Sequence, residues 1–327
     1  MYDCDTFREH IADAQRILLT GPVRPDADSI GACLALREVL TRWGKDATVA
    51  GDIAFRYQDL PGAADIVRDE DVRGPFDAVV VIDGDRHRLT PPIENLFERT
   101  SHRFVIDHHA TTEADGYLFA WIAPNETSTC TMIQKALARW REPLDATLAA
   151  LLYAGTVYDT GGFRYQNTTA ETHRLAADLL ACEIDHVTIA AQTLVERRIG
   201  GLRLLAATLS CSKPLVNDML MMSKLSAKTL QEHGADISDC DGIVDVLLHV
   251  VGVEVAALII EVEHEQCKIS LRGRGMLDLA QVAKSLTPTG GGHRNASGAR
   301  LACDPSEAES RIVSALTPLL VSTTIPS

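Results

Sequence analysis

The sequence has 327 residues, of which 46% are hydrophobic and 23% are charged, and its formal net charge is −14. This length suffices for two domains that each bury a core, and the composition is typical of an ordinary globular protein. The negative charge argues against non-specific binding of long nucleic acid, which needs a basic face, whereas a small anionic substrate remains compatible with it.

The eight cysteines are scattered, without a Cys-x-x-Cys pair, so their spacing fits neither a zinc finger nor a disulfide framework. Free thiols indicate a reducing compartment, and we expect a cytoplasmic protein. The N-terminal segment, Asp5 to Gln15, has the pattern of an amphipathic helix rather than a signal peptide. The most apolar window, Ile243 to Val262, is broken by Asp245, His249 and Glu254, which favours strands or a helix end over a membrane span.

The first half of the chain alternates between strand-like apolar runs and segments with helical periodicity. Arg16 to Thr20 and Asp77 to Asp83 are nearly continuous in apolar residues, as buried parallel strands are. This alternation predicts an α/β fold with a doubly wound, mainly parallel sheet. The expected strands are 16–20, 46–50, 77–83 and 103–107, and the expected helices are 5–15, 29–43, 91–99, 126–140, 144–158 and 169–181.

The pattern changes after about residue 185, where a long charged segment at 185–205 has helical character. We expect a first domain at 1–185, a helical connector at 186–212 and a smaller α/β domain at 213–327. The second domain is expected to contain strands at 215–223, 253–262 and 267–271, and helices at 277–286 and 305–319, with a loop at 287–297.

Several expected strands and helices end in groups that bind metals. The strand at 103–107 runs into Asp107, His108 and His109, and the strand at 77–83 ends in Asp83. In an open α/β sheet, ligands lie beyond the carboxyl ends of the strands. A carboxylate at the end of an apolar strand is costly unless it is paired, hydrogen-bonded to a loop or bound to a metal.

Two further acidic segments flank helices. Asp26 and Asp28 lie between a strand and a helix, where N-capping explains one of them, expected to be Asp28, and leaves Asp26 unexplained. Asp159 follows an apolar run and is compatible with a simple helix end. Together, four carboxylates and a histidine form an oxygen-rich set suited to Mn²⁺ or Mg²⁺, with the imidazole favouring Mn²⁺. Two such ions activate water and stabilise charge on a phosphoryl group, so the set suits phosphoester hydrolysis.

The second domain contains a segment that can hold an anion. Thr289 is followed by Gly290, Gly291, Gly292 and His293, and successive backbone N–H groups without Cβ atoms can surround a phosphate. A flexible linker is the alternative for this run. Arg272 and Arg274 end a strand and could hold phosphate or stack on bases, although solvated surface arginines would look the same.

Taken together, these motifs resemble the DHH phosphoesterase family with its DHH-associated C-terminal domain, and most closely the nanoRNases that also hydrolyse 3′-phosphoadenosine 5′-phosphate (pAp). They occur in the family's order over nearly the whole chain. The matching segments are Arg24 to Gly31, Val81 to Asp83, Ile106 to His109, Gly155 to Gly161, Ser270 to Arg272 and Gly290 to His293. The resemblance implies a two-Mn²⁺ site in the first domain, a substrate-binding second domain and a cleft between them.

The resemblance also implies a role for each matching residue. Asp26 would hold the first metal ion, Asp28, His108 and Asp159 the second, and Asp83 would bridge the two. Asp107 would orient His108, and His109 would face the scissile phosphate. The substrate would be bound by Arg272, Arg274, Gly290, Gly291, Gly292 and His293.

The sequence departs from the family pattern at two positions. Pro22 stands where the family carries a metal-binding histidine, so the first site should bind its ion more weakly or use water or His87 instead. Thr289 stands where another glycine is usual, which would alter the phosphate contact.

The resulting hypothesis is a manganese-dependent phosphoesterase that hydrolyses short oligoribonucleotides to mononucleotides and removes the 3′-phosphate of pAp. One alternative is a phosphodiesterase for linear or cyclic dinucleotides such as pGpG. Another is a catalytically weakened nucleotide-binding or regulatory protein, because of Pro22. Long duplex nucleic acid and membranes are not expected partners, and the sequence leaves a homodimer open.

Overall fold

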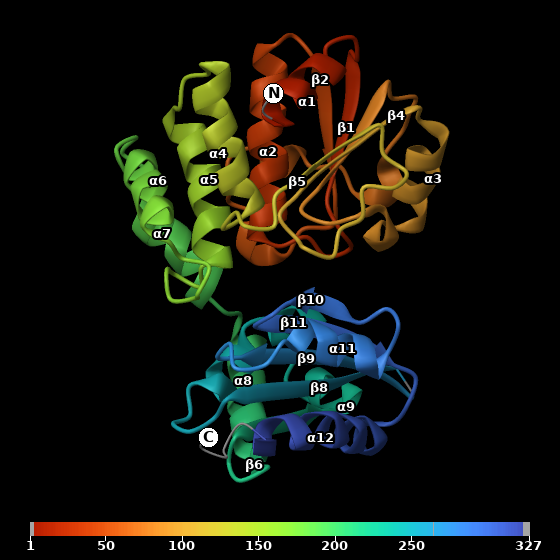
Figure 1. Cartoon of the computed structure of the whole chain (residues 1–327), viewed down its shortest axis with the longest axis vertical. Helices are drawn as coiled ribbons and strands as arrows, with labels where there is room; N and C mark the ends of the chain where they lie inside the picture. The colour runs from red at the N-terminus through yellow and green to blue at the C-terminus, as the bar shows by residue number, and fades with distance from the viewer. Residues whose placement is uncertain (1–2, 264, 323–327) are drawn as a thin grey trace. The chain divides into compact units, whose positions relative to one another are not determined.

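A computed structural model describes residues 3–263 and 265–322 and divides the chain into two compact units between Glu196 and Arg197 (Figure 1). This division falls inside the 186–212 segment that the sequence predicts as a connector. The segment is not one continuous helix. Helix α7 (His186–Ala190) passes into a π-helical turn (Ala191–Val195), and α8 (Ile199–Cys211) begins after a break.

The first unit is built on a five-stranded sheet whose strands are all parallel, in the order β2-β1-β3-β4-β5. This arrangement confirms the predicted α/β fold with a parallel sheet. The short edge strand β5 has no counterpart among the predicted strands. The bounds are β1 Arg16–Thr20, β2 Asp46–Ala50, β3 Ala78–Ile82, β4 His102–Asp107 and β5 Phe119–Ile122.

Helices cover both faces of this sheet, as doubly wound folds require. Helices α2, α4 and α5 pack against one another on one face, and α3 lies on the other (Figure 1). Each face contributes its own set of buried apolar side chains, so the sheet is sandwiched between two cores. The helices are α1 Asp3–His10, α2 Ala27–Arg42, α3 Pro91–Arg99, α4 Thr129–Trp140, α5 Ala146–Asp159 and α6 Ala170–Leu180.

Helices α2 and α5 approach closely because glycines lie at their contact. A Cβ atom on Gly155 would lie 2.3 Å from Sγ of Cys130 and 2.6 Å from Oδ1 of Asp28. A Cβ atom on Gly31 would lie 2.5 Å from the carbonyl oxygen of Leu151. The absence of these two side chains brings the C-terminal part of α5 next to the first turn of α2.

The second unit is an α/β domain with a mixed six-stranded sheet in the order β10-β11-β9-β8-β7-β6. Strands β7 and β8 are parallel and the other neighbours are antiparallel. The strands are β6 Lys213–Leu215, β7 Leu220–Leu225, β8 Val255–Glu263, β9 Gln266–Gly273, β10 Gly291–His293 and β11 Ala296–Leu301. The helices after α8 are α9 Ala227–Glu232, α10 Ile243–Leu248, α11 Leu279–Leu286 and α12 Pro305–Ser322.

The prediction of a loop at 287–297 is wrong in part, because this segment contains β10 and the start of β11, which form an antiparallel hairpin. Gly291 pairs with Gly298 and His293 pairs with Ala296, while β11 continues the sheet beside β9. Gly292 has φ = 130°, a conformation that residues with a Cβ atom rarely adopt. The glycine run is therefore the edge strand of a sheet and not a linker.

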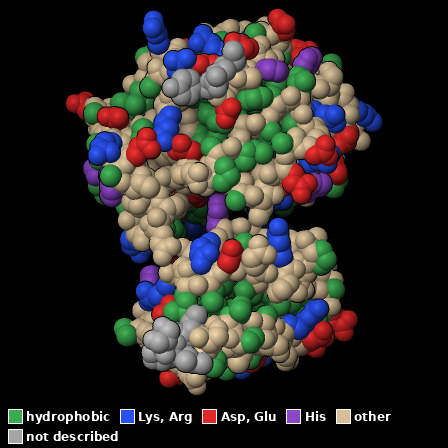
Figure 2. All heavy atoms as spheres, viewed as in Figure 1, with side chains coloured by type: hydrophobic (Ala, Val, Ile, Leu, Met, Phe, Trp, Pro, Cys, Tyr) green, Lys and Arg blue, Asp and Glu red, His purple; other side chains and the backbone are tan. Residues whose placement is uncertain are grey.

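On the face drawn in Figure 2, acidic and basic side chains are interspersed, and the described residues form no extended basic surface there. Among the helices that the structure describes, none combines the length and the apolar composition needed to cross a bilayer.

Candidate metal centre

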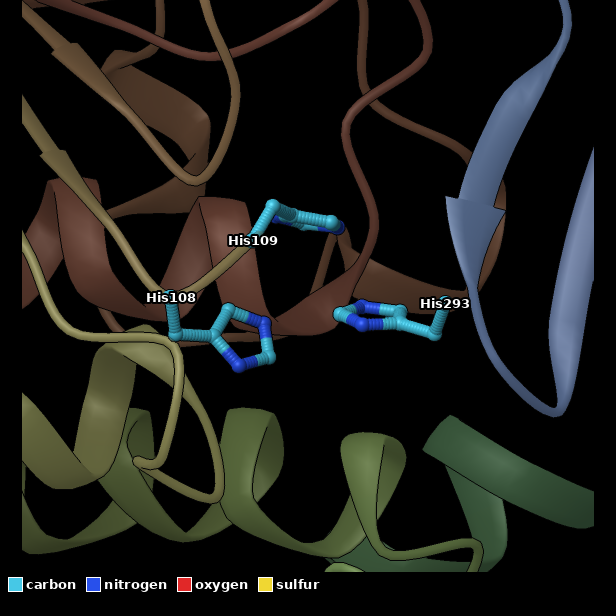
Figure 3. A group of neighbouring side chains, drawn as sticks. All are labelled: His108, His109 and His293. Atoms are coloured by element: carbon cyan, nitrogen blue, oxygen red, sulfur yellow. The ribbon is translucent and has the colours of Figure 1, made fainter. Parts of the chain in front are cut away.

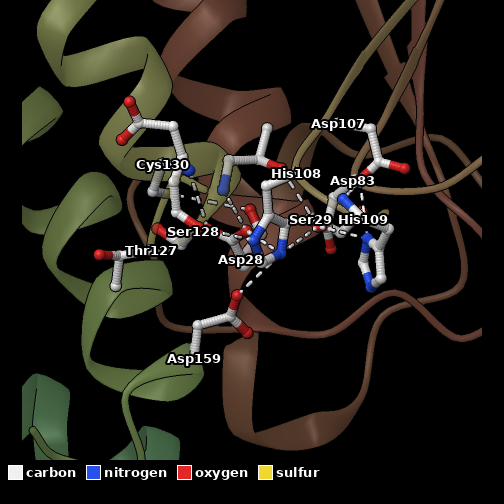
Figure 4. Close-up of polar contacts among 12 residues, drawn as sticks. Asp28, Ser29, Asp83, Asp107, His108, His109, Thr127, Ser128, Cys130 and Asp159 are labelled. Atoms are coloured by element: carbon white, nitrogen blue, oxygen red, sulfur yellow. Dashed lines mark hydrogen bonds and ion pairs between the residues drawn. The ribbon is translucent and has the colours of Figure 1, made fainter. Parts of the chain in front are cut away.

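Three carboxylates converge on one imidazole in the first unit (Figure 4). Nε2 of His108 lies 3.0 Å from Oδ2 of Asp159, 3.5 Å from Oδ1 of Asp83 and 3.9 Å from Oδ2 of Asp28. The side chains of Asp28, Asp83 and His108 are all at most 5% exposed, and that of Asp159 is 15% exposed. Four of the five residues that the sequence names as a possible metal site, all but Asp26, therefore converge at His108.

The fold explains this convergence. Asp83 and His108 follow the adjacent parallel strands β3 and β4, whose carboxyl ends lie at the same sheet edge. Asp28 lies in the first turn of α2, and Asp159 is the last residue of α5, which the glycine contact holds beside α2. Asp83 has φ = 61°, an uncommon left-handed conformation for a residue with a side chain, of a kind that clusters at functional sites.

The start of helix α4 holds two of these carboxylates. The backbone N–H of Thr129 donates to Oδ2 of Asp28 over 2.7 Å, and that of Cys130 donates to Oδ1 over 2.9 Å. The hydroxyl of Thr129 donates to Oδ1 of Asp83 over 3.2 Å. Sequence reasoning placed the start of this helix at Glu126 and missed these contacts. The signal was Ser128, a strong N-cap residue directly before Thr129.

The N-cap of α2 is Asp26 and not Asp28, which corrects the sequence-based expectation. Oδ1 of Asp26 accepts from the backbone N–H groups of Asp28 and Ser29 over 3.0 and 3.1 Å. The choice depends on backbone angles, since Asp26 has the extended conformation of an N-cap and Asp28 is already helical. The buried carboxylate of Asp28 therefore does not cap α2.

Asp107 has a different neighbour from the one that the resemblance implies. Its Oδ1 lies 2.7 Å from Nδ1 of His109, and its Oδ2 accepts from the hydroxyl of Thr112. Nδ1 of His108 instead lies 3.3 Å from the carbonyl oxygen of Glu126. The two imidazoles are 4.8 Å apart between ring centroids, at an interplanar angle of 63° (Figure 3). Asp107 therefore orients His109, while a backbone carbonyl orients His108.

Burial and the charges of neighbouring groups shift the pKa values of the aspartates and of His108 in this cluster. Burial, together with the charge of Asp28, raises the pKa of Asp83 to about 8, and burial with the charge of Asp159 raises that of Asp28 to about 6. Burial, together with Asp83, raises the pKa of Asp26 to about 8. Burial opposes the charged form of His108, but the carboxylates, led by Asp159, outweigh it and hold its pKa well above the usual value.

These residues fit a divalent cation. Ligand atoms of Asp28, Asp83 and His108 all lie within 4.8 Å of one another, and so do those of Asp83, Asp107 and His109. Oδ2 of Asp159 is buried and faces Nε2 of His108 at 3.0 Å. In the ion pairs among the described residues, the partners of Asp28, Asp83 and Asp159 are histidines, not lysine or arginine. A cation would offset this concentration of buried negative charge.

The set of ligands expected for the first metal ion is less complete. Asp26 is engaged as an N-cap, and the groups of potential ligands in the described part of the chain include neither Asp26 nor His87. Pro22 is buried, 3.3 Å from the position that a Cβ atom on Gly84 would take. His87 is exposed on a short 3₁₀ helix, Arg86–Arg88.

The candidate substrate residues lie in the second unit. Nε of Arg272 lies 3.1 Å from Oδ1 of Asp245, so its guanidinium is oriented by α10. Arg274 donates to the carbonyl oxygens of Val253 and Leu248 over 2.8 and 2.7 Å. Its guanidinium therefore fixes the turn between α10 and β8. Gly290 precedes β10, and β10 carries Gly291, Gly292 and His293.

Comparison with known proteins confirms the resemblance. Residues 16–156 match the DHH family, N-terminal domain, and residues 220–320 match the DHHA1 domain. The bifunctional oligoribonuclease and PAP phosphatase NrnA of Thermus thermophilus is 28% identical over 303 residues, which cover 92% of this chain and 89% of that protein. NrnA of Bacillus subtilis is 26% identical over 298 residues, covering 87% and 89%.

Two further proteins are similar to this chain over most of its length. The cyclic-di-AMP phosphodiesterase GdpP of Bacillus subtilis is 24% identical over 308 residues, which cover 88% of this chain and 45% of that protein. The crystal structure of an exopolyphosphatase-related protein from Bacteroides fragilis has a TM-score of 0.86 at 25% identity, covering 98% of this chain and 97% of that one.

Proposed function

Because residues 16–156 match the DHH family, N-terminal domain, and residues 220–320 match the DHHA1 domain, we propose that this protein is a metal-dependent hydrolase of short oligoribonucleotides and of the 3′-phosphate of pAp. The observation that supports this proposal most is the convergence of Asp28, Asp83 and Asp159 on Nε2 of His108. The NrnA relatives, which share most of their length with this chain, support the choice of substrate.

Mn²⁺ is the proposed cofactor, because three carboxylates and an imidazole offer the mixed oxygen and nitrogen ligands that it accepts. Asp28, Asp83, His108 and Asp159 would hold one ion. A second ion would rest on Asp26 and Asp83, with Pro22 unable to contribute a ligand. Such ions supply activation of water and stabilisation of the charge that develops on a phosphoryl group.

The chain's own residues would act beside the metal. Nδ1 of His109 donates to Oδ1 of Asp107, which fixes the ring, and a carboxylate in this position favours the protonated imidazole. A protonated His109 can stabilise a phosphate oxygen or donate a proton to a leaving oxygen. In the second unit, Arg272 and the backbone of the β10 hairpin would bind the nucleotide's phosphate.

A dinucleotide phosphodiesterase is the second candidate function. It is favoured by the similarity to GdpP, which extends over 88% of this chain. The −14 net charge and the mixed surface of Figure 2 suit either small substrate better than a long nucleic acid strand.

A side-by-side substrate assay tests the proposal. Chelator-treated protein is incubated with pAp, a dinucleotide RNA, pGpG and a cyclic dinucleotide, with and without Mn²⁺. We expect Mn²⁺-dependent release of mononucleotides from the dinucleotide RNA and of phosphate from pAp, both abolished in Asp83→Ala. Preferential turnover of the cyclic dinucleotide would favour the second candidate. Tight nucleotide binding without turnover would support a regulatory protein weakened by Pro22.

A further inference from the structure

We propose that Thr129 is a positioning residue, whose hydroxyl fixes the carboxylate of Asp83 relative to that of Asp28 and so sets the affinity of the metal site. This proposal rests on the proposed function, because it assumes that these two carboxylates hold a cation. It assigns a role to a residue outside the acidic motifs.

Thr129 donates hydrogen bonds to both carboxylates, one from its backbone and one from its side chain. It is fully buried and is the first residue of α4. Its backbone N–H donates to Oδ2 of Asp28 over 2.7 Å and its hydroxyl to Oδ1 of Asp83 over 3.2 Å. Asp28 belongs to α2 and Asp83 follows β3, so a third element ties together two carboxylates that repel each other.

The helix itself does not need this hydroxyl. The N-cap of α4 is Ser128, whose side chain accepts from the backbone N–H of Thr131 over 3.1 Å, and the hydroxyl of Thr131 completes the capping box. An N1 side chain makes no contribution to that arrangement. The hydroxyl of Thr129 is thus directed to Asp83 while the helix is capped by other residues.

Loss of the hydroxyl should act on the metal site. Oδ1 of Asp83 would keep its neighbours His108 and His109, at 3.5 and 3.8 Å, but would lose the neutral donor that holds it beside Asp28. Valine matches threonine in shape, so Thr129→Val removes the bond without opening a cavity, and the backbone bond to Asp28 stays. A neighbour that orients a metal ligand typically changes metal affinity by about 10- to 100-fold.

The test is equilibrium dialysis of chelator-stripped, full-length protein against Mn²⁺, with thermal unfolding of the metal-free protein as a second readout. We expect Thr129→Val and Thr129→Ala to weaken Mn²⁺ binding about tenfold or more, and Thr129→Ser to stay within about threefold of the wild type. Thr208→Val is the matched control, because this buried hydroxyl donates to the carbonyl oxygen of Leu204 in the second unit. It should leave Mn²⁺ binding unchanged.

Three outcomes would overturn the proposal. Unchanged Mn²⁺ affinity in both Thr129→Val and Thr129→Ala would show that the hydroxyl does not position the site. Equal loss in Thr129→Ser would show that the methyl group, and not the hydroxyl, matters. A wild-type protein that binds no Mn²⁺ would remove the proposed function together with this role, whereas the first two outcomes leave the proposed function standing.

Discussion

Nε2 of His108 lies 3.0 Å from Oδ2 of Asp159, although one residue follows a strand and the other ends a helix. Neither position is unusual in the sequence, and each has an ordinary structural explanation when taken alone. Their contact shows that α5 contributes to the same cluster as the sheet edge, which extends the candidate metal centre beyond the strand ends.

Removal of the Asp159 carboxylate should weaken metal binding. Asp159→Asn keeps the size of the side chain and removes its charge, so we expect Mn²⁺ affinity to fall by about 100-fold or more, because ligands matter at least as much as the groups that orient them. Calorimetric titration with Mn²⁺ measures this. Asp145→Asn is the control, since Asp145 caps the other end of α5 and asparagine caps equally well. Equal losses in both variants would contradict a local role for Asp159.

A methyl group at Gly155 should disturb the cluster through packing. The added Cβ would lie 2.6 Å from Oδ1 of Asp28, so Gly155→Ala must displace α5 or the carboxylate. We expect a net loss of about 1–2 kcal/mol in the free energy of unfolding, because overpacking outweighs the gain in helix propensity, together with weaker Mn²⁺ binding. Urea unfolding and metal titration check this.

Gly51→Ala is the control for that substitution, because its new Cβ would come no closer than 3.5 Å to Cγ of Pro25. A Gly155→Ala protein as stable as the wild type, with full Mn²⁺ affinity, would show that the contact between α2 and α5 tolerates a side chain.

The metal-free protein should lose stability as the pH rises. The folded-state pKa values of Asp26 and Asp83 are about 8, against 3.8 for an unperturbed carboxyl group, so the folded state binds more protons than the unfolded state between these values. The raised pKa of His108 acts in the same direction, since its stabilising protonated form is lost as the pH passes its folded-state pKa. We expect a lower melting temperature at about pH 8 than at about pH 6 after chelation.

Mn²⁺ should reverse this trend, because a bound cation favours the ionised carboxylates that the folded protein otherwise disfavours. Differential scanning calorimetry at both pH values, with and without Mn²⁺, measures the effect, and Asp83→Asn should flatten the pH dependence. A melting temperature of the metal-free protein that rises toward pH 8 would contradict the proposed electrostatics.

Substitution of Pro22 tests whether the first metal site lacks a ligand. Its ring is buried beside Gly84, next to Asp83, so a histidine at this position would add a ligand where the resemblance expects one. We expect Pro22→His to raise Mn²⁺ affinity or to add a second bound ion, measured by titration with the wild type alongside. An unchanged titration curve would show that another group, or water, already fills this position.

The sequence predicted the parts of the fold that local patterns determine. Strands β1 and β2 and helix α3 have the predicted bounds, and Asp83 and His108 were found because apolar strands end in polar groups there. Strand β5, with four residues, is too short to show periodicity. The β10 hairpin depends on pairing with β9 through β11, a long-range contact that a glycine run does not reveal.

The candidate site was predictable in composition but not in detail. The exchange of roles between Asp26 and Asp28 follows from a helix that begins at Ala27, and helix starts are poorly defined by sequence. The pairing of Asp107 with His109, and not with His108, depends on side-chain geometry after the strand. The contacts of Thr129 join segments far apart in the chain, so no local pattern indicates them.

Anomalous diffraction at the manganese absorption edge, from crystals of the protein soaked in Mn²⁺, tests the central claim most directly. We predict a strong peak within coordinating distance of Asp28, Asp83, His108 and Asp159, absent in crystals of Asp83→Ala. A peak elsewhere, or no peak at this cluster in well-ordered wild-type crystals, would contradict the assignment of these residues as the metal centre.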